Sequence, residues 1–406
     1  MSELLLALDL GTTTLAGRLL DTQGQALAEG RVANPQQVLG SDIIRRLEAV
    51  LAGNGERLQG LLLDGITVLL DDLLRATGAG RAQIAAAAVA ANPGVTALLC
   101  GDDVHPLLFQ PHRPKNLALR SLDLPPLRLP IPLTVFPLLS GYVGGDLVAC
   151  LYGLAPVAGR TLCVDLGTNG EIAIGDAEGW LATSVPAGPA FEGGEISCGQ
   201  LAVAGAISNV VRSGDRLQFE VIGGGAPTGL AGSGLFALIA VAVENGLIDH
   251  SGRILAPAEV ESTLAHYLHS DGSTYALCLY RDATRKIIIT QADIRAFQLA
   301  KGAVRAGIEA LLARAEVAAA RVEQVIVTGA FGLSLDRQRL KSVAILPAVM
   351  VEKAVFIPGG ALAGVQRFLL QGEGRAELQT LMEKMRGYPL SGTPAFERAF
   401  LAALNF

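Results

Sequence analysis

Short apolar runs separated by small and polar turn residues dominate two stretches of the chain and predict two β-meanders. Each meander has three expected strands, at 4–10, 15–21 and 26–32 in the first stretch and at 161–166, 171–175 and 180–184 in the second. The order of strand, turn and strand therefore occurs twice. This repetition predicts an internal duplication into two halves.

Apolar residues with a 3.6-residue period predict helices between and after the meanders. These helices are expected after the capping pair Ser41-Asp42 and at 56–76, 95–100, 146–154, 234–245 and 291–316. Further strands are expected at 83–91, 218–222, 324–328 and 354–357, with one or two helices after the last strand. We interpret 116–137, rich in Pro and Leu, as an irregular connection and 250–285 as an insertion or cover. The pattern favours a mixed α/β fold. We place the first half at 1–157 plus 358–406 and the second at 158–357.

Each meander contains the same polar turn between its first two strands. The first copy is Asp9-Leu10-Gly11-Thr12-Thr13-Thr14 and the second is Asp165-Leu166-Gly167-Thr168-Asn169-Gly170. A carboxylate at the end of a buried strand, followed by backbone N–H groups and hydroxyls, suits magnesium and phosphate together. One copy alone is more typical of an ordinary hairpin turn. Two copies in the same context favour the magnesium–phosphate interpretation.

Composition and charge exclude several classes of partner. The 406 residues carry a net charge of −6 without a dense Lys/Arg block, so nucleic acid and anionic membranes are not expected as partners. The sequence begins with an acidic residue where a signal peptide has a basic one, and no apolar run approaches the ~18 to 20 residues of a membrane span. We expect a cytoplasmic protein. The oligomeric state stays open, a homodimer included.

The five cysteines do not predict a metal centre. They are widely separated and form no C-x-x-C pair, so neither a zinc site nor an iron–sulfur cluster is expected in this chain. All five are expected to be reduced thiols in or near the core. Cys198, in a Gly-rich stretch, is the one cysteine for which we do not dismiss a functional role.

Two Gly-rich segments complete a recognisable order. Gly232-Ser233 precedes a helix, and Gly329-Ala330-Phe331-Gly332 follows a strand, where a nucleotide can lie close to the backbone. With the two Asp-x-Gly-Thr turns, this order resembles the superfamily of acetate kinases, sugar kinases, chaperones and actin. The resemblance implies a duplicated ribonuclease-H-like (actin-like ATPase) fold with a nucleotide cleft between two halves.

Several stretches look more specifically like the ATP-binding domain of the reductive activators of corrinoid proteins. They are Asn34-Pro35-Gln36, Gly40-Ser41-Asp42, Asn92-Pro93, Gly141–Asp146, Asp165–Glu171, Ala187–Gly199, Gly232–Leu235, Thr290–Gly307 and Gly329–Gly332. The resemblance implies an ATPase that returns a cobalt(II) corrinoid protein to the cobalt(I) state. Such activators usually carry an iron–sulfur domain, whereas the first cysteine here is Cys100. Either a separate low-potential electron donor supplies the electron, or the chain is an ATP-driven conformational machine without a redox role.

The resemblance also implies roles for single residues. Asp9 and Asp165 are the expected Mg²⁺ ligands, through water, and the hydroxyl, amide and glycine residues of both turns would hold the phosphates of ATP. Asp146 and Glu171 are the candidates for orienting the attacking water. A helix-capping carboxylate at Asp146 and a solvated charge at Glu171 are the plain alternatives. Glu192 is expected to line the cleft, to touch the partner or to be a simple turn residue.

Two other functions remain compatible with these residues. A small-molecule kinase would use the same cleft with a substrate acceptor near Asp146. A nucleotide-dependent, chaperone-like binding protein would use ATP only to set its affinity for a client.

Overall fold

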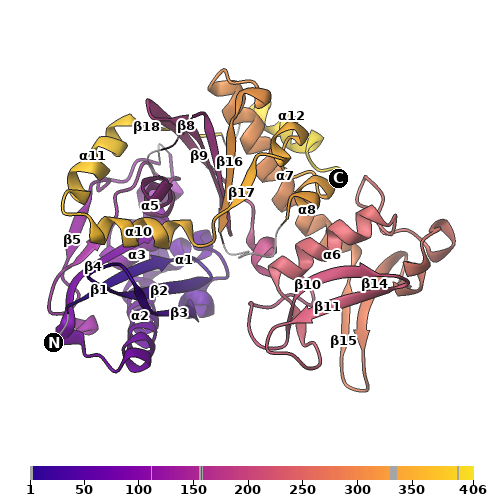
Figure 1. The fold of residues 1–406 in the computed structure, drawn as a ribbon, viewed down its shortest axis with the longest axis horizontal. Helices are drawn as coiled ribbons and strands as arrows, with labels where there is room; N and C mark the ends of the chain where they lie inside the picture. Colours follow the sequence, from indigo (N-terminus) through magenta and orange to yellow (C-terminus); the bar gives the residue numbers. More distant parts are fainter. Residues whose placement is uncertain (1–2, 111, 155–156, 158, 330–335, 391–392) are drawn as a thin grey trace. The chain divides into compact units, whose positions relative to one another are not determined.

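The computed structural model describes residues 3–110, 112–154, 157, 159–329, 336–390 and 393–406. Contacts divide the chain into two compact units (Figure 1). The first contains Met1–Ala158, Asp176–Thr183 and Gly359–Pro389, and the second contains Gly159–Gly175, Ser184–Pro358 and Leu390–Phe406. This division groups 390–406 with the second unit, whereas the predicted boundaries grouped that segment with the first half.

The first unit is built on a six-stranded sheet of order β3-β2-β1-β4-β6-β5. Its strands are β1 (Leu4–Leu10), β2 (Thr14–Asp21), β3 (Ala26–Ala33), β4 (Ile84–Ala91), β5 (Arg120–Leu122) and β6 (Leu133–Val135). The meander β1-β2-β3 is antiparallel, and β4 continues the sheet parallel to β1. The predicted meander and the strand at 83–91 are confirmed. The prediction of an irregular 116–137 is wrong, because β5 and β6 lie there and extend the sheet beyond β4.

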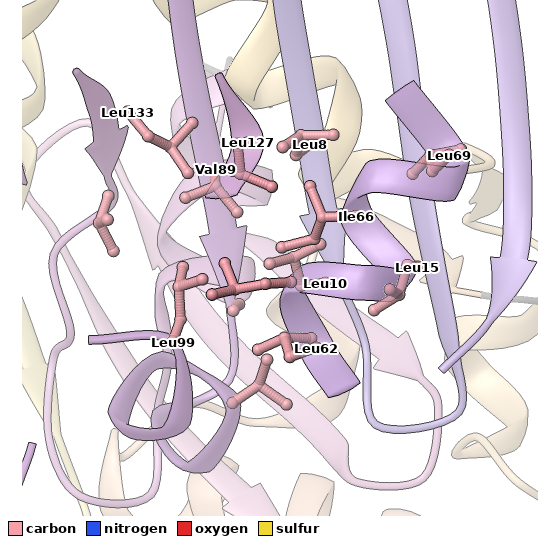
Figure 2. Packing of buried hydrophobic residues seen from close by; sticks show 14 of the residues in the cluster. Leu8, Leu10, Leu15, Leu62, Ile66, Leu69, Val89, Leu99, Leu127 and Leu133 are labelled. Atoms are coloured by element: carbon pink, nitrogen blue, oxygen red, sulfur yellow. The ribbon is translucent and has the colours of Figure 1, made fainter. Parts of the chain in front are cut away.

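Helices bury both faces of this sheet. Leu8 and Leu10 of β1 pack with Leu62, Ile66 and Leu69 of α2 (Gly55–Thr77) (Figure 2). Leu5 and Ala7 point to the opposite face and are also buried. Figure 1 shows α10 (Gly360–Leu370), from late in the sequence, beside β1 and β4. A strand buried on both faces explains why 4–10 reads as a nearly continuous apolar run.

The remaining helices of the first unit are short. They are η1 (Pro35–Leu39), α1 (Ile43–Ala49), the π-helical η2 (Val50–Asn54), η3 (Arg81–Gln83), α3 (Pro93–Cys100), α4 (His105–Leu108), η4 (Pro125–Leu127), α5 (Gly145–Leu154) and α11 (Gly374–Lys384).

The second meander belongs to a six-stranded sheet of order β17-β16-β7-β8-β9-β18. The strands are β7 (Thr161–Leu166), β8 (Gly170–Asp176), β9 (Gly179–Val185), β16 (Gln324–Gly329), β17 (Ala354–Phe356) and β18 (Met385–Gly387). As in the first sheet, a hairpin is followed by a parallel neighbour, here β16 beside β7. The predicted repetition of strand, turn and strand is therefore present.

Two smaller sheets accompany the second unit. One has the order β11-β10-β12, with β10 (Ala206–Ser213), β11 (Arg216–Val221) and β12 (Gly229–Leu230). The other has the order β13-β14-β15, with β13 (Leu268–Asp271), β14 (Thr274–Arg281) and β15 (Lys286–Ile289). Strand β10 is absent from the predicted elements. Much of the stretch interpreted as an insertion folds as the sheet β13-β14-β15.

The helices of the second unit include the two long ones expected from the periodicity, α6 (Gly232–Glu244) and α7 (Gln291–Arg314). The shorter ones are η5 (Pro189–Glu192), η6 (Pro257–Glu259), η7 (Thr263–Tyr267), η8 (Ala319–Arg321), α8 (Arg337–Ser342), α9 (Ala348–Val351) and α12 (Pro394–Ala402). Helix α12 packs on α7, and Gln298 of α7 donates to the Leu404 carbonyl at 2.9 Å. In the described part of the chain, no helix has the length and apolar character of a membrane span.

Candidate functional site

Two buried asparagines brace the first Asp-x-Gly-Thr turn, which joins β1 to β2. The Asn34 backbone N–H donates to the Thr13 carbonyl at 2.8 Å, and its Nδ2 donates to the Gly11 carbonyl at 3.0 Å. Asn92 Nδ2 donates to Thr12 Oγ1 at 3.0 Å, while Asn92 Oδ1 caps α3 by accepting from the Val95 N–H. The turn is thus held from both sides by neutral amides, which explains why the two Asn-Pro pairs accompany it in the sequence.

Asp9 lies one residue before the end of β1. Its direct neighbours in the sheet are Ala16 of β2 and Ala90 of β4. Side chains paired across adjacent strands point to the same face. The Asp9 carboxylate is therefore flanked by two methyl groups and not by larger side chains.

Asp146 lies in the first turn of α5, in the same unit as the first Asp-x-Gly-Thr turn. A Cβ added to Gly144 would lie 2.6 Å from the Ala91 carbonyl oxygen, so the segment before α5 passes directly over the end of β4. Asp146 Oδ1 accepts from the Leu147 N–H at 2.8 Å, as expected for an acid in the first turn of a helix. Burial raises the pKa of Asp146 to about 6, so this carboxylate can exchange a proton near neutral pH.

Three carboxylates surround the second turn, which joins β7 to β8. Asp165 of β7 stands directly opposite Glu171 of β8. Glu171 is only 6% exposed and accepts from Ser184 Oγ at 3.3 Å, so it is not a solvated charge. Thr168 Oγ1 donates to Glu192 Oε2 at 2.7 Å, which brings Glu192 to the turn. Like charges directly opposite in a sheet are destabilising. A divalent cation would offset this repulsion, so the donor set fits Mg²⁺.

Gly329, the last residue of β16, lies against the same turn. Its φ is +114°, and an added Cβ would lie 2.8 Å from Asp165 Oδ1. Thr328 pairs with Asp165 in the parallel ladder and is buried. The predicted loop begins here, but Ala330, Phe331 and Gly332 lie outside the described residues.

Gly232 and Ser233 have evident packing roles. A Cβ on Gly232 would lie 1.7 Å from the Phe191 carbonyl oxygen, and Ser233 Oγ donates to the Ser208 carbonyl at 2.8 Å. These contacts fix α6 against η5 and β10. Their predicted part in nucleotide binding remains a prediction.

Asp293 of α7 holds the loop at Ser197, a contact that the sequence did not predict. It is buried, and its carboxylate accepts from the Ser197 N–H at 2.7 Å and from Ser197 Oγ at 2.6 Å. The same carboxylate closes the capping box with Thr290. Burial, reinforced by the charge of Asp293, raises the pKa of Cys198 to about 12, so that this thiol stays protonated at neutral pH. The capping box was readable from the sequence, but the contact with Ser197 was not.

Among the described residues, no three His, Cys, Asp or Glu side chains gather as a protein-only metal cage. The first turn and Asp146 belong to the first unit, whereas Asp165 and Glu171 belong to the second. Their assignment to one common nucleotide site therefore stays a prediction.

Comparison with known proteins assigns both parts of the chain to one family. Residues 159–406 match the family described as "C-terminal domain of RACo the ASKHA domain", and residues 4–155 match the "RACo middle region". The predicted actin-like and sugar-kinase-like fold is confirmed.

Two curated proteins are similar over 99% of this chain. Corrinoid activation enzyme RamQ of Eubacterium limosum is 29% identical, and the match covers 70% of that protein. The [Co(II) methylated amine-specific corrinoid protein] reductase of Methanosarcina barkeri is 20% identical, with 76% covered. A solved structure described as "Reductive activator for corrinoid,iron-sulfur protein" is 29% identical and superposes with a TM-score of 0.91. The match covers 100% of this chain and 66% of the chain in that structure.

Proposed function

Because this chain belongs to the family of the reductive activators of corrinoid proteins, we propose that it binds Mg²⁺-ATP and uses its hydrolysis to reactivate a corrinoid protein. In the proposed reaction, a cobalt(II) corrinoid gains one electron and becomes cobalt(I), while an external low-potential donor loses that electron. ATP and water give ADP and phosphate. The observation that carries the proposal is the pair of Asp-x-Gly-Thr hairpins, each with a carboxylate and a braced turn, in a chain of this family.

Each turn contributes a different part of the proposed chemistry. The threonines and backbone N–H groups of 11–14 and 167–170 would bind the phosphates, and Asp9 and Asp165 would hold the metal through water. Bound Mg²⁺ would offset the charge that develops on the phosphates. Asp146, whose pKa burial raises to about 6, and Glu171 would orient the attacking water. Catalysis of this kind consists mainly of positioning and charge compensation, so rigid turns suit it.

The electron is proposed to come from outside these 406 residues. All five cysteines of the chain are free thiols, and two of them, Cys150 and Cys163, are fully buried. Cluster ligation needs four thiolates in close spacing. A purified preparation of this chain should therefore lack the visible absorption of an iron–sulfur cluster.

ATP can drive the uphill step only by changing which state of the complex is favoured. The corrinoid protein must bind differently to the ATP and ADP forms, since a contact made equally in both forms shifts nothing. We therefore expect a slow basal ATPase that a cobalt(II) corrinoid protein stimulates.

The test is anaerobic absorption spectroscopy of a candidate corrinoid protein with a low-potential donor, with ATP added or withheld. We expect cobalt(I) to accumulate only with ATP, and phosphate release to rise with the corrinoid protein. Asp165→Ala should abolish both effects. Asp176→Ala is the matched control. Asp176 is the last residue of β8, at the end of the strand away from the turn, and its carboxylate accepts from the Glu178 N–H.

Three other results would separate the alternatives. A phosphorylated metabolite would indicate a kinase. Partner affinity that depends on ATP, without cobalt(I), would indicate a chaperone-like binding protein. Neither cobalt(I) nor an ATP-dependent complex would overturn the proposal.

A further inference from the structure

Arg46 of α1 is a fully buried arginine with 0% of its surface exposed. Its Nε donates to the Gly40 carbonyl at 2.9 Å, and its Nη1 donates to Gln36 Oε1 at 3.2 Å. In the part of the chain that the structure describes, Nη2 finds no acceptor. Burial lowers the pKa of Arg46 to about 10, against the raising effect of Asp42, so the guanidinium remains charged at neutral pH.

A continuous series of hydrogen bonds connects Arg46 to the first Asp-x-Gly-Thr turn. Gln36 Oε1, which accepts from Arg46, also accepts from Asn34 Nδ2 at 3.3 Å. The same Nδ2 donates to the Gly11 carbonyl, and the Asn34 N–H donates to the Thr13 carbonyl. Asn34 and Gln36 are fully buried, so this relay runs through the interior behind the turn.

Stability of the fold does not explain why the buried residue is an arginine. A buried charge with an unpaired nitrogen destabilises a protein, and an apolar side chain of similar size is often neutral or stabilising at such a site. Asp42 does not neutralise Arg46 by direct contact, because its Oδ1 caps α1 through the Arg45 N–H and its Oδ2 pairs with Arg45 Nε at 3.3 Å. Features that cost stability are typical of functional positions.

We propose that Arg46, acting through Gln36 and Asn34, is a positioning residue that fixes the turn Gly11–Thr14 for the phosphates of the nucleotide. The proposal rests on the proposed function. Gln36 Oε1 accepts from both Arg46 and Asn34, so the guanidinium fixes the Gln36 side chain, which in turn holds Asn34 Nδ2 toward the Gly11 carbonyl. The guanidinium also places a positive charge behind a turn that is to receive an anion.

The experiment uses the full chain and its neighbouring arginine as a control. Arg46→Met and Arg45→Met make the same charge change at adjacent positions, but the Arg45 side chain is 68% exposed. A third variant, Gln36→Glu, leaves Arg46 in place and supplies a carboxylate that neutralises it. Calorimetry would measure binding of Mg²⁺-ATP and of adenosine to each protein, with thermal unfolding measured without nucleotide.

We expect Arg46→Met to weaken ATP binding about ten-fold or more, as supporting residues behind a binding site commonly do. Adenosine binding should be unchanged, because adenosine carries no phosphate. Arg45→Met should stay within about two-fold of the parent for both ligands, since an exposed charge is screened. Gln36→Glu should reduce the ratio of ATP to adenosine affinity in the same direction as Arg46→Met.

A merely structural role would lower the unfolding temperature and leave the ATP-to-adenosine ratio at the parental value. If Arg46→Met does not fold, Gln36→Glu decides the question by its own ratio. Parental ratios in the folded variants, with normal ATP binding by the parent, overturn this inference alone. A parent protein that binds neither ligand overturns the proposed function and the inference together.

Discussion

A substitution at Gly329 tests how tightly β16 packs against the second turn. The residue has a φ of +114°, a conformation that L side chains rarely adopt. A Cβ added there would lie 2.3 Å from the Leu166 carbonyl oxygen and 2.8 Å from Asp165 Oδ1. Leu166 is paired on both sides, with Gly329 in β16 and Gly170 in β8, so its carbonyl cannot easily move away.

Two costs determine the effect of Gly329→Ala. Left-handed backbone conformation costs an L residue about 1–2 kcal/mol. Inserting a methyl group into a filled space costs about 1–3 kcal/mol more. The free energy of unfolding should therefore fall by about 2–5 kcal/mol, and the Asp165 carboxylate should be displaced from its position in the parent protein.

Denaturant unfolding of the full chain measures this cost, with Gly224→Ala as the matched control. Gly224 also has a positive φ, +74°, but an added Cβ would meet no atom within 4 Å. The control variant therefore carries the backbone cost without the collision and should lose about 1 kcal/mol. If both variants unfold at the same denaturant concentration, β16 does not approach the turn as described, and the argument from close packing is wrong.

Three further predictions concern charged groups. Asp165→Ala should raise the Mg²⁺ concentration needed for ATP binding more than Asp9→Ala does, because Asp165 and the adjacent Glu171 form a pair of carboxylates that favours the cation. Calorimetry at several Mg²⁺ concentrations checks this. ATP turnover should fall as the pH drops through about 6, where the buried Asp146 becomes protonated, and Asp146→Asn should lower turnover and remove this dependence in a phosphate-release assay. Burial, with a contribution from Arg305, lowers the pKa of Lys301 to about 7, below its unfolded value, so the unfolded state binds more protons between these values. Stability should therefore rise with pH above about 7 by up to about 1.4 kcal/mol per pH unit in the parent, and Lys301→Met should remove this slope in denaturant unfolding at several pH values.

The fold was predictable where the pattern is local. The meanders were visible because each strand is a compact apolar run and each turn contains Gly, Asn or Thr. Strand β6 was missed because three buried residues, Leu133–Val135, are too few to show a period, and prolines precede them. The contacts of the last segment with Gln298 and Lys301 of α7 were not predictable, because they join residues about a hundred positions apart.

The candidate site was likewise predictable only where its residues are close together in the sequence. Asp9 and Asp165 could be singled out because the carboxylate and its turn are consecutive in sequence. The partners of the turns are remote: Glu192 reaches Thr168 across 24 positions, and Asn92 reaches Thr12 across 80. Nothing in the local sequence around Arg46 indicates burial, because its neighbour Arg45 carries the same charge and is exposed. These relations appear only when the chain is folded.

The two turns share a sequence pattern but differ in the groups that support them. Neutral amides hold the first turn, and the cation of Arg46 lies behind them. Three carboxylates, those of Asp165, Glu171 and Glu192, surround the second turn. The buried guanidinium behind the first turn favours the phosphates, whereas the carboxylate oxygens beside the second turn favour the metal ion. A duplicated pair of equivalent turns would divide phosphate and metal equally. The different supporting residues instead favour a division of labour, in which the first turn binds mainly phosphate and the second binds mainly the hydrated magnesium ion.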